Sequence, residues 1–112
     1  MRIVPEELRN RAVPIGNEWI LSYEDALAAV SLATLNQIAV LGFDAGEVQA
    51  NGFQIVDYSD DRSEFAGDWK EYVRACNADA EDWMKKHRYG RNFGYIVSST
   101  SEKEFAQLLR RN

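Results

Sequence analysis

The feature that most constrains this chain is a set of apolar residues between 69 and 84 that recur with the period of a helix. Its members fall at positions i, i+3, i+4, i+7, i+11, i+14 and i+15, which is one face of a helix of about four to five turns. They are Trp69, Tyr72, Val73, Cys76, Ala80, Trp83 and Met84. Asp68 is placed to cap this helix at its start. A helix with such a face has to bury it against another layer of the fold.

The other apolar segments predict a second long helix and four strands. Ser22 and the helical spacing after it predict a helix over Tyr23–Leu35. The uninterrupted apolar run 38–43 is too short for an ordinary helix and predicts a buried strand, followed by a turn or loop at 44–47. Further strands are expected at 19–21, 52–58 and 93–97, and shorter helices at 4–11 and after Ser101, which has capping-box spacing to Glu104.

This order of elements is neither a strict alternation of strands and helices nor an all-β pattern, so it favours the α+β class. We expect a mainly antiparallel sheet of about four strands with the helices packed mostly on one face. A domain typically has ~100–200 residues, so the 112 residues of this chain are expected to form one domain, 1–112.

Composition excludes several kinds of site. A single cysteine leaves no internal disulfide framework and no cysteine-rich zinc site. No apolar run approaches the ~20 residues of a membrane span, and the first residues lack the apolar stretch of a signal peptide. The sequence contains no motif that is typical of a cofactor or metal site. We therefore expect a cytoplasmic protein with no membrane association, no cofactor and no metal.

The formal net charge of −5 conceals a segregation along the chain. Residues 1–43 have a net charge of −2, residues 44–82 of −8, and residues 83–112 of +5. An acidic chain is a poor nucleic-acid binder, because phosphate contacts come from Lys and Arg. The acidic middle is suited to a basic protein surface, and it is equally explained as a solvated face that keeps the protein soluble.

The residues that could carry chemistry have simpler structural explanations. Cys76 lies inside the apolar stripe, and a core cysteine is the expected role. His87 is eleven residues further on, about 16 Å along a helix, which is too far for a cysteine–histidine pair. The acids Asp57, Asp60 and Asp61 lack the glycine and the distal glutamate of a calcium loop. We therefore expect no catalytic residues and no enzyme.

Several segments together carry a family resemblance. In chain order these segments are Tyr23-Glu24-Asp25-Ala26-Leu27, Ile38-Ala39-Val40-Leu41-Gly42-Phe43-Asp44, Tyr58-Ser59, the helix that begins at Trp69, Tyr95-Ile96-Val97-Ser98 and Ser101-Glu102-Lys103-Glu104-Phe105. Over residues 15–109 the chain resembles small immunity proteins of bacterial polymorphic toxin and contact-dependent inhibition systems, most nearly the group called immunity protein 40. Gly42 and Asp44 match that group's Gly-x-Asp strand end. The resemblance implies a cytosolic protein without catalytic residues that binds one cognate toxin domain and blocks it.

Under this hypothesis the toxin meets the acidic residues and the aromatic residues near them, since aromatic anchors with acids at the rim are typical of tight interfaces. The candidate contact residues are Asp57, Tyr58, Asp60, Asp61, Glu64, Asp68, Trp69 and Tyr72. A core position is the stronger interpretation of Trp69, whereas both a core and an interface role are open for Tyr58, Tyr72 and Tyr89. The alternative surface is the basic segment with Lys85, Lys86, Arg88 and Arg91.

Two other functions are consistent with the residues, and the oligomeric state is open. One is a small ligand-binding domain or enzyme that uses the carboxylates and His87. The other is a scaffold subunit that dimerises through an apolar surface. An inhibitor predicts an exposed acidic or aromatic patch without a deep pocket, whereas an enzyme predicts a cleft whose titratable groups have shifted pKa values.

Overall fold

The computed structural model describes residues 6–59 and 64–110 and has the α+β class expected from the sequence. Along the chain its elements are helix α1 (Glu6–Arg9), strands β1 (Val13–Ile15) and β2 (Glu18–Ile20), helix α2 (Tyr23–Leu35), strands β3 (Ala39–Gln49) and β4 (Gly52–Tyr58), helix α3 (Trp69–Lys86), strand β5 (Phe93–Thr100) and helix α4 (Glu102–Arg110). None of the helices in this described part combines the length and the apolarity needed to cross a membrane.

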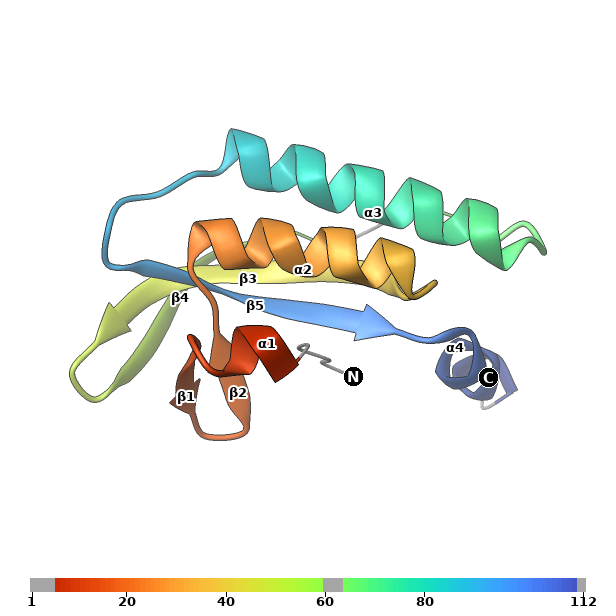
Figure 1. Cartoon of the computed structure of the whole chain (residues 1–112). Coiled ribbons are helices and arrows are strands. Elements are labelled where there is room, and N and C mark those ends of the chain that lie inside the picture. The colour runs from red at the N-terminus through yellow and green to blue at the C-terminus, as the bar shows by residue number, and fades with distance from the viewer. Residues whose placement is uncertain (1–5, 60–63, 111–112) are drawn as a thin grey trace.

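The main sheet has three antiparallel strands in the order β4-β3-β5, with the long strand β3 in the centre. Helices α2 and α3 lie side by side above this sheet, and the small hairpin β1-β2 lies below it with α1 (Figure 1). Helix α3 packs on β3, and α2 packs on β5 and on α3. Strand β4 is an edge strand, so one of its sides has no neighbouring strand in the described structure.

The expectation of one four-stranded sheet is wrong, because the strands form a three-stranded and a two-stranded antiparallel sheet. The strand predicted at 19–21 pairs as β2 with an additional strand, β1, which the sequence did not indicate. In the described part of the chain its single backbone pairing with the main sheet is at Leu21, which exchanges two backbone hydrogen bonds of 2.8 Å with Tyr95. Ser22 follows immediately and caps α2 by accepting from the Asp25 N–H at 3.1 Å, so the strand cannot continue along β5.

The loop predicted at 44–47 is also wrong, because these residues lie inside β3 and pair with strands on both sides. Small residues are required there by the close approach of neighbouring groups. A Cβ at Gly46 would lie 2.4 Å from the Gln54 carbonyl oxygen and 2.7 Å from the Phe53 ring. The glycine that indicated a turn is therefore an adaptation to the crowded centre of the sheet.

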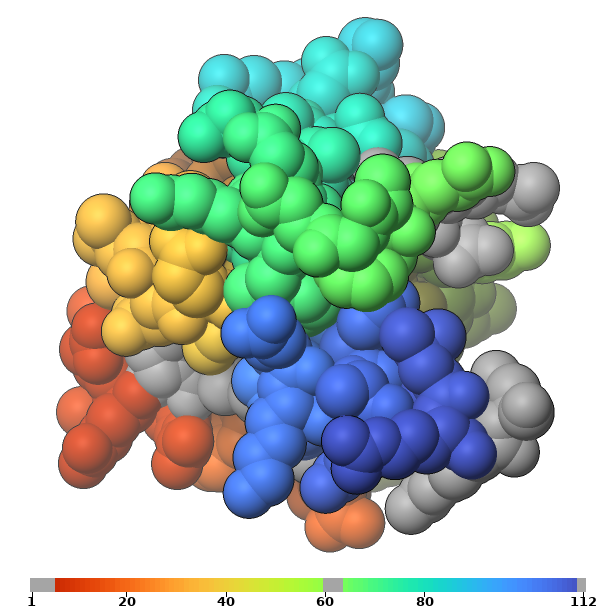
Figure 2. Space-filling view, turned by 90° about the vertical axis from the view of Figure 1, so that its right-hand side faces the viewer, coloured from red at the N-terminus to blue at the C-terminus, as the bar shows by residue number. Residues whose placement is uncertain are grey.

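The start of α3 and the helix α4 meet at one end of the molecule, as Figure 2 shows in green and blue. Phe105 of α4 lies in van der Waals range of Trp69 and Tyr72, with ring centroids 5.6 Å and 5.0 Å apart. The predicted capping box holds α4 in place, since Ser101 and Glu104 bond each other's backbone N–H groups. This aromatic cluster attaches α4 to the helix layer.

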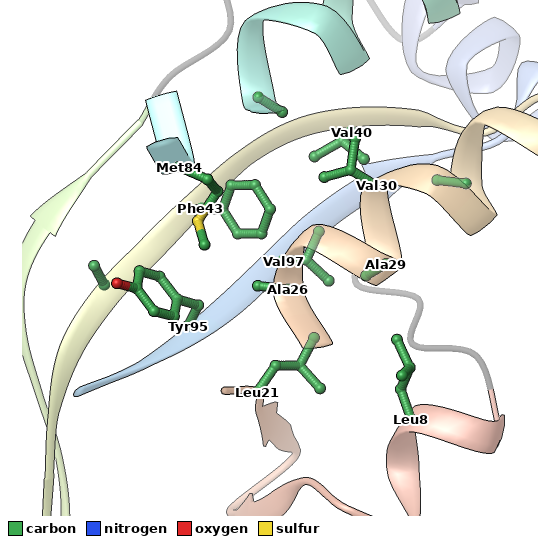
Figure 3. Packing of buried hydrophobic residues seen from close by; sticks show 13 residues of the cluster. Leu8, Leu21, Ala26, Ala29, Val30, Val40, Phe43, Met84, Tyr95 and Val97 are labelled. Carbon is green, nitrogen blue, oxygen red and sulfur yellow. The ribbon is translucent and has the colours of Figure 1, made fainter. Parts of the chain in front are cut away.

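The principal core lies between the two long helices and the sheet (Figure 3). Phe43 and Tyr95 come from the sheet, Val30 from α2 and Met84 from α3, and all four side chains are buried. The apolar stripe predicted for α3 is confirmed as its buried face. Trp83 is half-buried at the margin of this core and stacks on Phe43 with the ring planes 9° apart.

One buried polar residue joins these layers. Asn77 of α3 is 3% exposed and uses both ends of its amide. Its Oδ1 accepts from the Val40 N–H at 2.7 Å, and its Nδ2 donates to the Thr34 hydroxyl at 2.7 Å and to the Ile38 carbonyl at 3.0 Å. An N–H only donates and a carbonyl only accepts, so this set of partners permits a single orientation of the amide. The bonds tie α3 to the end of α2 and to the start of β3.

We predict that Asn77→Ala lowers the free energy of unfolding by about 1–3 kcal/mol, because it leaves the buried Val40 N–H and Ile38 carbonyl without their side-chain partner. Urea denaturation followed by circular dichroism measures the loss. Ala78→Ser, at the adjacent exposed position, is the control and should change stability by less than about 0.5 kcal/mol. Equal midpoints for Asn77→Ala and the parent chain would contradict the role given to this amide.

Candidate functional site

A cleft of about 720 Å³ lies between α3 and the strands β3 and β4. Its volume falls in the ~300–1,000 Å³ range of sites that bind small molecules or side chains of a partner. It opens to solvent between exposed side chains of α3 and of the β4 end. The lining residues are Val40, Leu41, Gly42, Asp57, Tyr58, Ser59, Cys76, Asp79, Ala80, Asp82, Trp83, Lys86 and His87.

The strand wall of the cleft depends on Ser59, which folds back against β3. Its N–H donates to the Phe43 carbonyl and its hydroxyl accepts from the Phe43 N–H, both at 2.8 Å. A Cβ at Gly42 would lie 2.3 Å from the Ser59 carbonyl oxygen, so only glycine permits this approach. Gly42 thus shapes the cleft wall, and the strand end expected at Gly42 and Asp44 is wrong, because β3 continues to Gln49.

Three side chains converge at one end of the cleft. The Tyr89 hydroxyl donates to Oδ2 of Asp57 at 2.7 Å, and the Tyr58 N–H donates to Oδ1 at 2.8 Å. The hydrogen bond from Tyr89, followed by that from the Tyr58 backbone, holds the pKa of Asp57 below its ordinary value. The same bond raises the pKa of the Tyr89 hydroxyl, because the carboxylate stabilises its protonated form. Nε2 of His87 lies 3.9 Å from Oδ2 of Asp57.

His87 is the C-cap of α3 and is half-buried. Its Nδ1 lies 2.8 Å from the Trp83 carbonyl, and this nitrogen carries a proton because a carbonyl only accepts. The imidazole stacks on the Trp83 ring with centroids 4.4 Å apart. The buried Tyr95 hydroxyl donates to the His87 carbonyl and accepts from the Tyr89 N–H, so the core holds both residues in place.

The helix wall carries further charges. Asp79 and Asp82 line the cleft one turn apart on α3, with Lys86 one turn beyond Asp82. Lys86 bonds Asp82 at 2.9 Å. The cleft therefore contains three carboxylates against one ammonium group and one imidazole, and this excess of negative charge favours a cationic ligand.

The predicted contact residues that the structure describes do not form one surface. Asp57 and Tyr58 lie on the cleft, and the Tyr58 side chain is 67% exposed. Glu64 and Asp68 are exposed near the other end of α3, where Asp68 caps the helix by accepting from the Glu71 N–H. Asp60 and Asp61 lie outside the residues that the structure describes.

Trp69 and Tyr72 are buried, at 8% and 7% exposed. The indole N–H of Trp69 donates to the Gln37 carbonyl at 2.7 Å, which confirms its core position. Their rings belong to the aromatic cluster with Phe105 and do not form part of the exposed surface. Cys76 is likewise a buried core residue.

The alternative basic surface is partly neutralised. Lys85 bonds Glu81 at 2.8 Å and Lys86 bonds Asp82. Arg88 bonds Glu24 at 3.2 Å and lies over the Tyr23 ring, 4.6 Å from its centroid. These pairs reduce the field that the +5 segment presents to a partner.

The sequence did not indicate Asp79 and Asp82 as cleft residues, nor Tyr89 as the residue that bonds Asp57 there. The spacing of Asp79, Asp82 and Lys86, at i, i+3 and i+7, places them on one flank of a helix beside its apolar face, and this signal was available. No pattern indicates the bond between Asp57 and Tyr89, because 32 residues separate them in the chain.

Within residues 6–59 and 64–110, no group of three or more histidine, cysteine, aspartate or glutamate side chains is arranged to hold a metal ion. Comparison with models of protein families, with curated proteins and with solved structures finds no match to this chain. The functional inference therefore depends on the geometry of the cleft.

We predict that Tyr89→Phe raises the pKa of Asp57 toward its ordinary value of about 3.9, because the largest stabilising bond to the carboxylate is removed. Carboxyl ¹³C titration by NMR measures this shift. The folded pKa of Asp57 lies below the unfolded one, so its stabilisation is present above the unfolded value and is lost as the pH falls through the folded value. The stability difference between Tyr89→Phe and the parent chain should therefore be present at pH 7 and should decrease as the pH falls through the folded pKa of Asp57.

Tyr58→Phe is the matched control, since it removes an exposed hydroxyl and keeps the backbone N–H that bonds Asp57. The Asp57 titration should be unchanged in this variant. If both variants shift the Asp57 pKa equally, the bond from Tyr89 is not its main cause.

Proposed function

We propose that this chain is an immunity protein that binds a toxin domain and blocks its active or substrate-binding surface. The single observation that carries the proposal is the acidic cleft, in which Asp57 of β4 lies together with Asp79 and Asp82 of α3. A toxin domain that acts on nucleic acid presents cationic side chains to phosphate. Carboxylates at an exposed cleft are suited to engage those cations and to exclude the substrate.

The surface beside the cleft supports a protein partner. Ile55 and Val56 of the edge strand are each 52% exposed, next to the more exposed Tyr58. Apolar and aromatic side chains at the centre, with charges around them, are typical of tight protein interfaces. Val56 is unpaired at a bulge of β4, and such a bulge opposes pairing of the edge with a second sheet. These features favour a side-chain interface with a different protein.

A small ligand-binding domain or enzyme is the second candidate, because a cleft whose titratable groups have shifted pKa values is what that function predicts, and Asp57, which lines the cleft and accepts from Tyr89, has a lowered pKa. Both oxygens of Asp57 accept hydrogen bonds, and its pKa is lowered, so the carboxylate is a weak proton acceptor. Cys76 is buried in the core at the cleft floor. The geometry thus supports binding of a cation better than acid–base chemistry.

We predict that co-expression of this chain restores growth to bacteria that produce the toxin domain encoded beside its gene. The physical reason is occupation of the toxin's substrate surface by the acidic cleft and its apolar rim. Colony counts with and without the chain measure protection. A chain that gives no protection, although it is expressed and folded, would overturn the proposed function.

A matched pair of variants tests the role of the cleft. Asp82→Asn removes a carboxylate of the cleft and its ion pair with Lys86, whereas Glu81→Gln removes the equivalent pair with Lys85 outside the cleft. With Asp79→Asn added to the first variant, association with the toxin should slow by about tenfold at low salt, and less at high salt. Stopped-flow fluorescence measures the rate, and an equal effect of Glu81→Gln would contradict the assignment of this cleft.

A further inference from the structure

We propose that the cleft between α3 and β4 receives an arginine side chain of the partner, whose guanidinium bonds Asp57. This inference rests on the proposed function, because the arginine is one of those with which the toxin would hold its own substrate. The negative charge of the cleft does not distinguish between arginine, lysine and a small organic cation as its ligand. This inference specifies arginine.

The first step is the free bonding capacity of Asp57. Each carboxylate oxygen has two lone pairs. Oδ1 uses one for the Tyr58 N–H and Oδ2 uses one for the Tyr89 hydroxyl, so among the residues that the structure describes each oxygen keeps one accepting position. Nε2 of His87 is 3.9 Å from Oδ2, beyond hydrogen-bond distance. One accepting position on each oxygen of a planar carboxylate is what the two parallel N–H groups of a guanidinium require.

The second step is preorganisation. The hydroxyl of Tyr89 and the backbone of Tyr58 hold Asp57 from two sides, and the hydroxyl of the buried Tyr95 fixes Tyr89 through its N–H. The carboxylate therefore does not have to be ordered when the cation arrives, which reduces the entropy cost of binding. A bidentate bond depends on such a fixed plane, whereas a rotating ammonium group does not need it.

The third step concerns the cleft residues that would contact the aliphatic part of the arginine side chain. Val40, Ala80 and the half-buried Trp83 form an apolar part of the cleft, which suits the aliphatic stem of arginine. Tyr58, whose backbone N–H bonds Asp57, also lines the cleft. Asp79 and Asp82 lie on the opposite wall and add to the negative potential, although Lys86 offsets part of it.

The test uses N-acetyl-arginine methylamide as the probe, with the lysine and citrulline counterparts for comparison, in NMR titrations of the full chain. The arginine probe is expected to shift the amide signals of Asp57 and Tyr58 and the indole signal of Trp83. Citrulline has the same shape without the charge, and lysine has the charge without the planar fork. Both should bind at least about threefold more weakly. Equal shifts with citrulline or lysine, or no shifts with arginine, would overturn the inference.

Two variants locate the site. Asp57→Asn should weaken binding of the arginine probe by about tenfold, since it removes the charge-assisted bonds. Asp82→Asn should weaken it less, and Glu81→Gln, outside the cleft, should leave it unchanged. If Asp57→Asn binds the probe as well as the parent chain does, arginine is bound elsewhere and the inference fails. Inorganic phosphate is added separately, and shifts of the same signals by phosphate would show an anion site and overturn it too.

The outcomes separate this inference from the proposed function. If the chain protects bacteria from the toxin and the arginine probe does not bind, the inference fails and the immunity function stands. If the probe binds and no protection is seen, the arginine site stands and the toxin partner is wrong.

Discussion

The buried amide of Asn77 is the contact on which the arrangement of the layers depends. It bonds Thr34 at the end of α2, and Ile38 and Val40 at the entry to β3. The amide thereby sets how closely α3 approaches the central strand. One wall of the cleft belongs to α3 and the other to β3 and β4, so the same contact also sets the width of the cleft. Apolar packing alone would permit α3 to slide along the sheet, whereas three directed bonds do not.

A second buried polar group, the hydroxyl of Tyr95, connects the core to the cleft. Tyr95 stands on β5, opposite Ala45 in the middle of the sheet, and its burial raises the pKa of its hydroxyl. That hydroxyl bonds the backbone of His87 and Tyr89, in the segment that connects α3 to β5. Tyr89 in turn bonds Asp57 on β4. A connection of core, loop and edge strand thus holds the carboxylate of the candidate site, and a site supported in this way keeps its geometry when a ligand binds.

The sequence predicted what depends on local periodicity and capping. The apolar stripe of α3, the caps Ser22 and Asp68, and the capping box at Ser101 all rest on contacts within a few residues. It failed where distant residues decide the structure. Gly46 indicates a turn in the sequence, and it lies in the central strand, where it pairs with strands on both sides and the close approach of β4 leaves no room for a side chain. The cleft depends on a pairing of residues 57 and 89 and on a packing angle of α3, neither of which a single sequence contains.

The folded structure changes what the charge segregation along the chain implies for binding. Along the chain the acidic middle and the basic last third are separate blocks. In the fold, the basic residues that follow the cleft pair with acids, as Lys85 does with Glu81 and Arg88 with Glu24, so a large part of the positive block is already neutralised. The carboxylate of Asp57 is held instead by uncharged donors, which stabilise its charge without cancelling it. A carboxylate stabilised by hydroxyl and amide groups keeps its full charge for a cationic partner, whereas one paired with a cation, as Asp82 is with Lys86, contributes less, and for this reason we propose Asp57 as the principal binding group of the cleft.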